Sequence, residues 1–169
     1  HAFNSWGCTG GNVSPRLEWS GAPEGTQSFA LTVYDPDAPT GSGFWHWVVV
    51  DIAPSVSEIP AGFASDGATA RGKREPRGPR GSRQGLNDYT LWFAGDKDMA
   101  GQYFGYDGPC PPWNDTLLHH YHFTLYAIDL ARCPVEGAFT GQQVKDAIAR
   151  HVLAEATLTG TYSLNPKVK

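Results

Sequence analysis

The sequence lacks several features that would assign it to a common class of protein. No run of 18 apolar residues occurs, because even FWHWVVVDIA contains His46 and Asp51, so no membrane-spanning helix is predicted. The only cysteines are Cys8, Cys110 and Cys133, which are too few for a disulfide scaffold and allow at most one bridge. They form no CxxC pair, so no zinc site is expected. Charged residues make up only 18% of the chain, which excludes a disordered polyelectrolyte.

The residues that are present favour one packed β domain. The chain has 169 residues, 40% of them hydrophobic and 12% aromatic, which is enough for a single core, and we expect one domain over residues 1–169. The 20 glycines and 13 prolines suit short strands joined by tight turns better than long helices. The composition therefore favours an all-β fold.

The charge is distributed unevenly along the chain. Residues 71–83 carry six basic side chains against Glu75, a charge of +5, and the net charge of −4 then leaves −9 on the rest. The segment RGKREPRGPRGSR is rich in glycine and proline, and we interpret it as an exposed loop. It is either a solvated loop or a docking site for a phosphate-rich or acidic partner. Nucleic acid is not an expected partner, because no aromatic residues alternate with these charges. The basic residues are Arg71, Lys73, Arg74, Arg77, Arg80 and Arg83.

Three segments have the period-two pattern of strong strands. SFALTVYD alternates until the prolines of DPDAP end it, Trp45 to Ile52 is aromatic and β-branched, and the third segment is 119–129. Strict alternation places Phe44, His46, Val48 and Val50 on one face of the second strand. In the third strand, the same alternation places four side chains on one face, those of His119, Tyr121, Phe123 and Leu125.

Shorter elements are predicted around these strands. Brief strands are expected in LEW, in 89–94 and in 161–164, and 105–115 is expected to be a loop because of its prolines. A single helix is predicted from the capping-box pair Thr140 and Gln143 through residue 155, with Val144, Ile148 and Val152 at a spacing of four.

Polar residues gather where the predicted strands end. Asp35, Asp37, His46, His119 and Tyr121 come from three separate strand ends and are candidates for one shared site. Taken alone, DPDAP is also explained as a turn in which aspartate caps its own backbone and proline fixes φ. The rigid GPCPP sequence is a candidate rim, whose glycine permits a ligand to approach closely.

Two long stretches resemble the phosphatidylethanolamine-binding protein family, in particular its bacterial YbhB/YbcL-like (Raf kinase inhibitor-like) branch. They are NVSPRLEWSGAPEGTQSFALTVYDPDAPTGSGFWHWVVVDI and GPCPPWNDTLLHHYHFTLYAID, and the resemblance spans roughly residues 3 to 164. It implies an antiparallel β-sandwich, with one C-terminal helix, and a pocket near one end. The resemblance further implies that this pocket binds an anion such as phosphate, phosphoethanolamine, acetate or cacodylate.

The same resemblance implies which positions form the ligand-binding pocket. The imidazoles and the phenol are expected to donate hydrogen bonds to anion oxygens, and tyrosine and tryptophan to form the walls. Asp35 is expected to hold an imidazole tautomer or to accept a hydrogen bond from a protonated ligand. The expected ligand-binding residues are Asp35, Asp37, Ala38, Pro39, Trp45, His46, Gly108, Pro111, Pro112, His119 and Tyr121.

The sequence also departs from the family. Trp113, Asn114 and Asp115 follow the double proline where relatives usually have a small turn, and we expect them to narrow the entrance. The C-terminal segment that shapes the pocket in animal relatives has no clear match.

These observations predict a binding protein, without a cofactor, that has a regulatory or inhibitory role. Relatives are described as inhibitors of kinases or proteases, but no particular kinase or protease partner is identified. The alternative is a phosphoester hydrolase that uses Asp35, His46 and His119 as acid and base, although no phosphate loop or nucleophile elbow supports it.

The HxH pair of His120 and His122 has no evident third ligand, so no metal is expected. His1 has the amine and the imidazole of a copper chelator, but a terminus exposed by processing or cloning explains a histidine at this position more simply.

Two further expectations concern location and pH. The chain begins at His1 without methionine, which fits removal of a targeting segment and favours a periplasmic or secreted protein, or merely a trimmed chain. Because imidazoles titrate near pH 6.5, anion affinity is expected to rise as the pH falls from about 8 to about 6.

Overall fold

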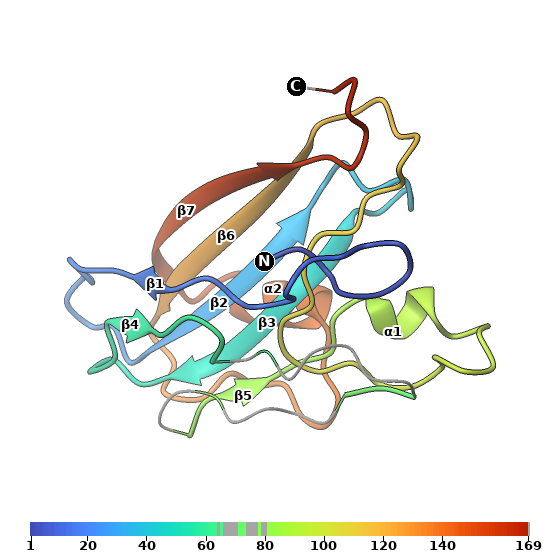
Figure 1. Cartoon of the computed structure of the whole chain (residues 1–169). Coiled ribbons are helices and arrows are strands. Elements are labelled where there is room, and N and C mark those ends of the chain that lie inside the picture. Colours follow the sequence, from blue (N-terminus) through green and yellow to red (C-terminus); the bar gives the residue numbers. More distant parts are fainter. Residues whose placement is uncertain (64, 66–70, 74–77, 79–80, 169) are drawn as a thin grey trace.

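The protein is an antiparallel β structure with few helices, seen in a computed structural model that describes residues 1–63, 65, 71–73, 78 and 81–168. A five-stranded sheet has the order β5-β3-β2-β6-β7, and β1 pairs with β4 in a separate two-stranded sheet (Figure 1). The elements are β1 Leu17–Glu18, β2 Ser28–Asp35, β3 Phe44–Ile52, β4 Glu58–Ile59, β5 Arg83–Gln84, α1 Tyr89–Trp92, β6 His119–Ile128, α2 Gly141–Ile148 and β7 Val152–Tyr162.

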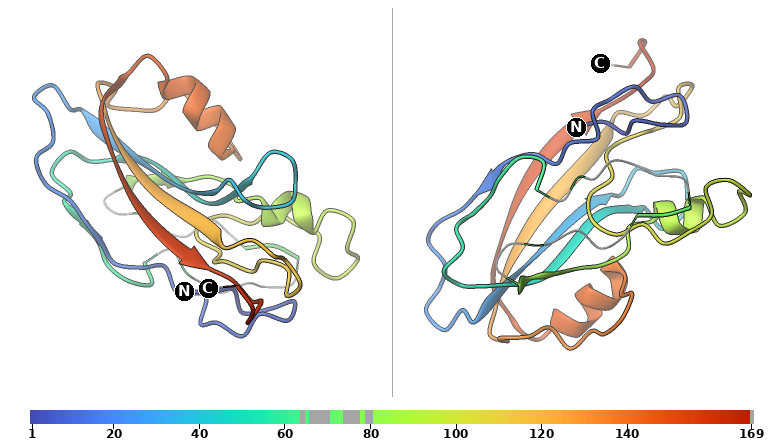
Figure 2. Two further views of the ribbon diagram at one scale, coloured as in Figure 1. Left: turned by 90° about the horizontal axis from the view of Figure 1, so that it is seen from above. Right: turned by 60° about the horizontal axis from the view of Figure 1, so that its bottom comes forward.

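The large sheet is covered on both faces, which produces the sandwich-like arrangement expected from the sequence. Phe29, Leu31 and Val33 of β2 pack toward the β1–β4 side, together with Ile59 of β4. The opposite face packs against α2, and the two views of Figure 2 show this helix and the N-terminal segment on opposite sides of the sheet. The alternation predicted for β2 is therefore confirmed. Within the described ranges, neither helix is both long and apolar enough to cross a membrane.

A β-bulge changes which side chains of β3 share a face. Trp47 pairs with Val33, but Trp45 pairs with the next residue, Tyr34, so that His46 is an extra residue in β3. Val48 and Val50 consequently pack on the α2 side, whereas the His46 ring contacts Tyr121, which belongs to the opposite face. The expectation that Phe44, His46, Val48 and Val50 share one face is thus wrong. A bulge re-aims a side chain in this way, and bulges are common beside functional sites.

Two other predictions of secondary structure are wrong. Residues 89–92 form the short helix α1 rather than a strand, since this places Tyr89 and Phe93 on one side, where both stack on Phe3. Helix α2 has the predicted capping box at Thr140 but ends at Ile148, and β7 begins at Val152. The pairing of β7 with β6 extends over nearly its whole length, and this pairing is a tertiary contact that the local pattern does not show.

The basic segment is not uniformly exposed, contrary to the sequence prediction. Lys73 is buried, with its Nζ 3.0 Å from Asp107 Oδ2, and Arg83 of β5 pairs with Asp51. Arg71 is exposed. The predictions for Arg74, Arg77 and Arg80 fall outside the described residues.

Cys8 and Cys110 form a disulfide across a separation of 102 residues, and Cys133 is a buried free thiol. The bond ties the N-terminal segment to the GPCPP sequence. Cys110 also lines the cavity described next, so the disulfide fixes one part of its wall.

Candidate functional site

A cavity of about 270 Å³ lies where β2 ends and where β3 and β6 begin. Antiparallel pairing of these neighbouring strands brings the three strand termini together at one end of the sheet. Eight of the expected ligand-binding residues line the cavity, and these are Asp35, Ala38, Pro39, His46, Pro111, Pro112, His119 and Tyr121. The rings of His46 and His119 lie on Tyr121, with centroid distances of 5.2 and 6.4 Å. The predicted convergence of these three side chains is observed.

Three expected residues lie outside the cavity lining. Asp37 accepts hydrogen bonds from the backbone and the ring of His120 at the surface. Trp45 faces α2 on the other side of the sheet. Gly108 does allow a close approach, but of the N-terminal segment rather than of a ligand, because a Cβ there would lie 1.9 Å from the carbonyl oxygen of His1.

His119 is held by two carboxylates. Its Nδ1 lies 2.7 Å from Asp35 Oδ2, and its Nε2 lies 3.1 Å from Asp115 Oδ2. An ionised carboxylate only accepts hydrogen bonds, so both ring nitrogens donate and the imidazole is charged. Burial lowers the pKa of His119, but the hydrogen bonds and charges of the two aspartates outweigh it, and the pKa is raised above 6.5.

His46 has a different protonation state. Its Nδ1 lies 2.8 Å from the carbonyl oxygen of Asp107, which can only accept, so Nδ1 carries the proton and Nε2 is an acceptor. Burial lowers the pKa of His46 to about 4. This imidazole is therefore neutral near pH 7, and it does not supply the second positive charge that the sequence led us to expect.

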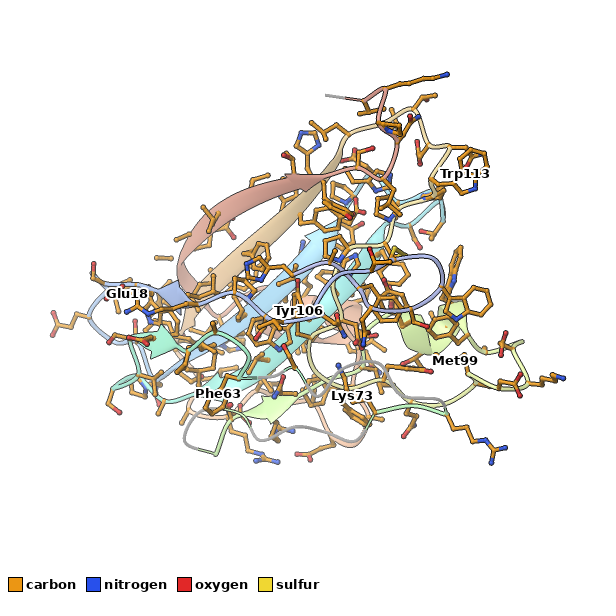
Figure 3. The ribbon with its side chains drawn as sticks, viewed as in Figure 1. Glu18, Phe63, Lys73, Met99, Tyr106 and Trp113 are labelled. Carbon is orange, nitrogen blue, oxygen red and sulfur yellow. A yellow bond between two sulfur atoms is a disulfide. The ribbon has the colours of Figure 1, made fainter. Side chains whose placement is uncertain are left out.

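A buried ion pair supports the backbone that holds His46. The Asp107 carboxylate accepts hydrogen bonds from Asn12 and Asn87 and pairs with Lys73, which Figure 3 labels below Tyr106 in the lower part of the molecule. Lys73 also donates to the carbonyl oxygen of Tyr106 over 2.6 Å. These contacts fix the carbonyl that orients the His46 ring.

The remaining lining is mainly aromatic and was not predicted, apart from Trp113, which was expected to narrow the entrance, and Cys110 of the expected GPCPP rim. Trp113 is 76% exposed and projects outward from the loop before β6 in Figure 3. For the N-terminal contribution the sequence offered only the presence of Cys8 and Cys110, because which of the three cysteines pair was left open and the structure shows the bond. The other lining residues are Trp6, Gly7, Thr40, Phe44, Tyr89, Trp92, Phe93, Cys110 and Leu164. Leu164 shows that the C-terminal segment does shape the cavity, although no match to the family was expected there.

No group of three or more histidine, cysteine or carboxylate side chains in the described part of the chain is arranged to hold a metal ion. His122 of the HxH pair contacts Thr159, and His120 contacts Asp37.

Comparisons with known proteins agree with the fold and cover nearly the whole chain. The family described as phosphatidylethanolamine-binding protein matches residues 2–163. Two Escherichia coli K12 proteins are similar: YbcL is 41% identical over 97% of this chain and 79% of its own length, and YbhB is 40% identical over 96% and 89%. A Mycobacterium tuberculosis protein, LppC, whose name includes the word lipoprotein, is 40% identical over 92% of this chain and 62% of its own length.

The crystal structure of E. coli YbcL, described as a new member of the mammalian PEBP family, superposes with a TM-score of 0.79. The match has 41% identity and covers 96% of this chain and 87% of that one. This chain therefore belongs to the phosphatidylethanolamine-binding protein family.

Proposed function

We propose that this protein binds a small anionic ligand, such as a phosphorylated headgroup, and that it acts as a regulator or inhibitor. The observation that supports this most is the pair of imidazoles, those of His46 and His119, that both contact Tyr121 in the lining of a mainly aromatic cavity. Cavities of this kind, apolar with a few convergent polar groups, are typical of ligand-binding sites. A kinase or protease as the regulated partner is part of the same proposal.

The protonation states favour a ligand that carries a hydrogen-bond donor as well as an anionic oxygen. His119 offers a positive charge, but Asp35 and Asp115 are negative, and neutral His46 offers an acceptor. Phosphate near neutral pH carries an O–H group, and phosphoethanolamine carries an ammonium group. Sulfate has neither and is the natural control.

Binding of phosphoethanolamine is expected to weaken as the pH rises through the raised pKa of His119, because the imidazolium then loses its charge. Replacing His119 by alanine should remove this pH dependence and weaken binding by about tenfold or more, the usual effect of a charge-assisted hydrogen bond. His46→Ala should weaken binding without changing the pH dependence between pH 6 and 8, since the pKa of His46 is about 4. Titration calorimetry measures all three effects.

Two results of the same titrations would contradict the proposal. One is affinity that does not fall at any pH above 6.5 at which the protein remains folded, since the pKa of His119 is raised above that value. The other is sulfate binding as tightly as phosphoethanolamine.

We further propose that the cavity is not catalytic. A general base works best with a pKa near the working pH, whereas the pKa of His46 is about 4 and both nitrogens of His119 are held by carboxylates. We expect no release of phosphate or alcohol from generic phosphoesters above the background rate. Turnover that His119→Ala abolishes would instead support the hydrolase that uses Asp35, His46 and His119.

We propose that the protein works outside the cytoplasm, as a periplasmic or secreted protein. The Cys8–Cys110 disulfide is of the kind that persists in oxidising compartments. The relative named as a lipoprotein is consistent with this location.

A further inference from the structure

The turn before β6 places a carboxylate of the chain itself on the cavity histidine. Asp115 Oδ2 lies 3.1 Å from His119 Nε2, and the other ring nitrogen is taken by Asp35 at 2.7 Å. Because Asp35 accepts from Nδ1–H, only Nε2–H of this ring is left to donate to a ligand oxygen. Asp115 already accepts a hydrogen bond from it. A carboxylate in this position resembles the oxygen of a bound anion.

The backbone holds Asp115 in place without using the bond to His119. The Asp115 N–H donates to the carbonyl oxygen of Pro112 over 3.1 Å, and the Asn165 side chain donates to the Asp115 carbonyl oxygen over 2.8 Å. The second carboxylate oxygen, Oδ1, accepts from the N–H of Leu117. Rotation of the side chain would release His119 and the Leu117 N–H, while the two hydrogen bonds of the Asp115 backbone would remain.

The two carboxylates on His119 differ in how easily they can be moved. The Asp35 side chain is 3% exposed, and its other oxygen accepts from the N–H of Asp37, so it is fixed within the strand end. The Asp115 side chain is 14% exposed and lies at the surface of its turn. With both aspartates ionised and His119 charged, the three groups carry a net charge of −1, which repels an anion that brings no donor.

We propose that Asp115 determines which anions the cavity accepts: a ligand must either displace this carboxylate from His119 or bring a hydrogen-bond donor that satisfies it. This inference rests on the proposed binding function, and it names the residue that sets the specificity. Ligands with an ammonium or hydroxyl group next to the anionic oxygen satisfy Asp115. A fully deprotonated anion is repelled by the Asp115 carboxylate and has to compete with it for the Nε2–H of His119.

The test is calorimetric titration of sulfate and of phosphoethanolamine into the wild-type protein, Asp115→Asn and a control variant, at one pH. The control is Asp129→Asn, which removes a carboxylate 2.8 Å from His151 at the opposite end of β6, about 30 Å away. Asp115→Asn should raise the affinity for sulfate by at least about tenfold, because a charge-assisted hydrogen bond no longer has to be broken. The preference for phosphoethanolamine over sulfate should fall accordingly, and Asp129→Asn should behave as the wild type.

The outcomes separate this inference from the proposed function. If the wild type and all variants bind neither ligand, the proposed function fails and this inference with it. If the wild type binds phosphoethanolamine but Asp115→Asn binds sulfate no better than the wild type, the inference alone is overturned. Asp115→Ala is a second variant that keeps the two hydrogen bonds of the Asp115 backbone but loses the one from the Leu117 N–H to Oδ1, and it should show the same gain for sulfate.

Discussion

Replacing Lys73 by methionine is expected to lower the free energy of unfolding by about 3 to 5 kcal/mol. The side chain is almost completely buried, and its Nζ lies 3.0 Å from Asp107, whose carboxylate is also buried. Methionine fills a similar volume but leaves Asp107 as an uncompensated charge in the interior. Urea unfolding followed by tryptophan fluorescence measures the loss.

The pH adds a second observable for this variant. Burial raises the pKa of Asp107, and the charge of Lys73 opposes that rise. Without Lys73 the carboxyl is more easily protonated, so the destabilisation should be larger at pH 8 than at pH 5. The matched control is Lys97→Met at an exposed position, which should change stability by less than about 0.5 kcal/mol. Equal stability of the two methionine variants would show that the ion pair is unimportant.

Removing the disulfide by the double substitution Cys8→Ser and Cys110→Ser is expected to cost about 2 to 4 kcal/mol of stability. The bond closes a long loop, with a sequence separation of 102, and so restricts the unfolded chain. It also anchors Trp6 and Gly7, which line the cavity beside Cys110, so affinity for phosphoethanolamine should fall as well. Thermal unfolding and calorimetry measure the two effects.

Reductant provides the control for the disulfide prediction. It should lower the unfolding temperature of the wild type toward that of the double variant and leave the double variant unchanged. A wild type whose stability does not respond to full reduction would contradict the prediction.

The main sheet was largely predictable because its strands carry local signals. β2 and β6 alternate between the two clusters that lie on either side of the sheet, so a period of two identified both strands and their faces. β7 carries no such signal, since most of its residues are exposed on an edge strand. Its length is set by pairing with β6, and it starts where the helical pattern was expected to continue.

The sequence by itself determined the family, the strand ends that meet at the cavity, and three of its polar residues, Asp35, His46 and His119. Only the tertiary structure decided how those residues behave. The bulge at His46 turns its ring toward Tyr121, burial keeps that ring neutral, and Asp115 occupies the free nitrogen of His119. The physical reason is that side-chain direction and protonation depend on register, burial and neighbouring charges, which arise from segments far apart in the chain.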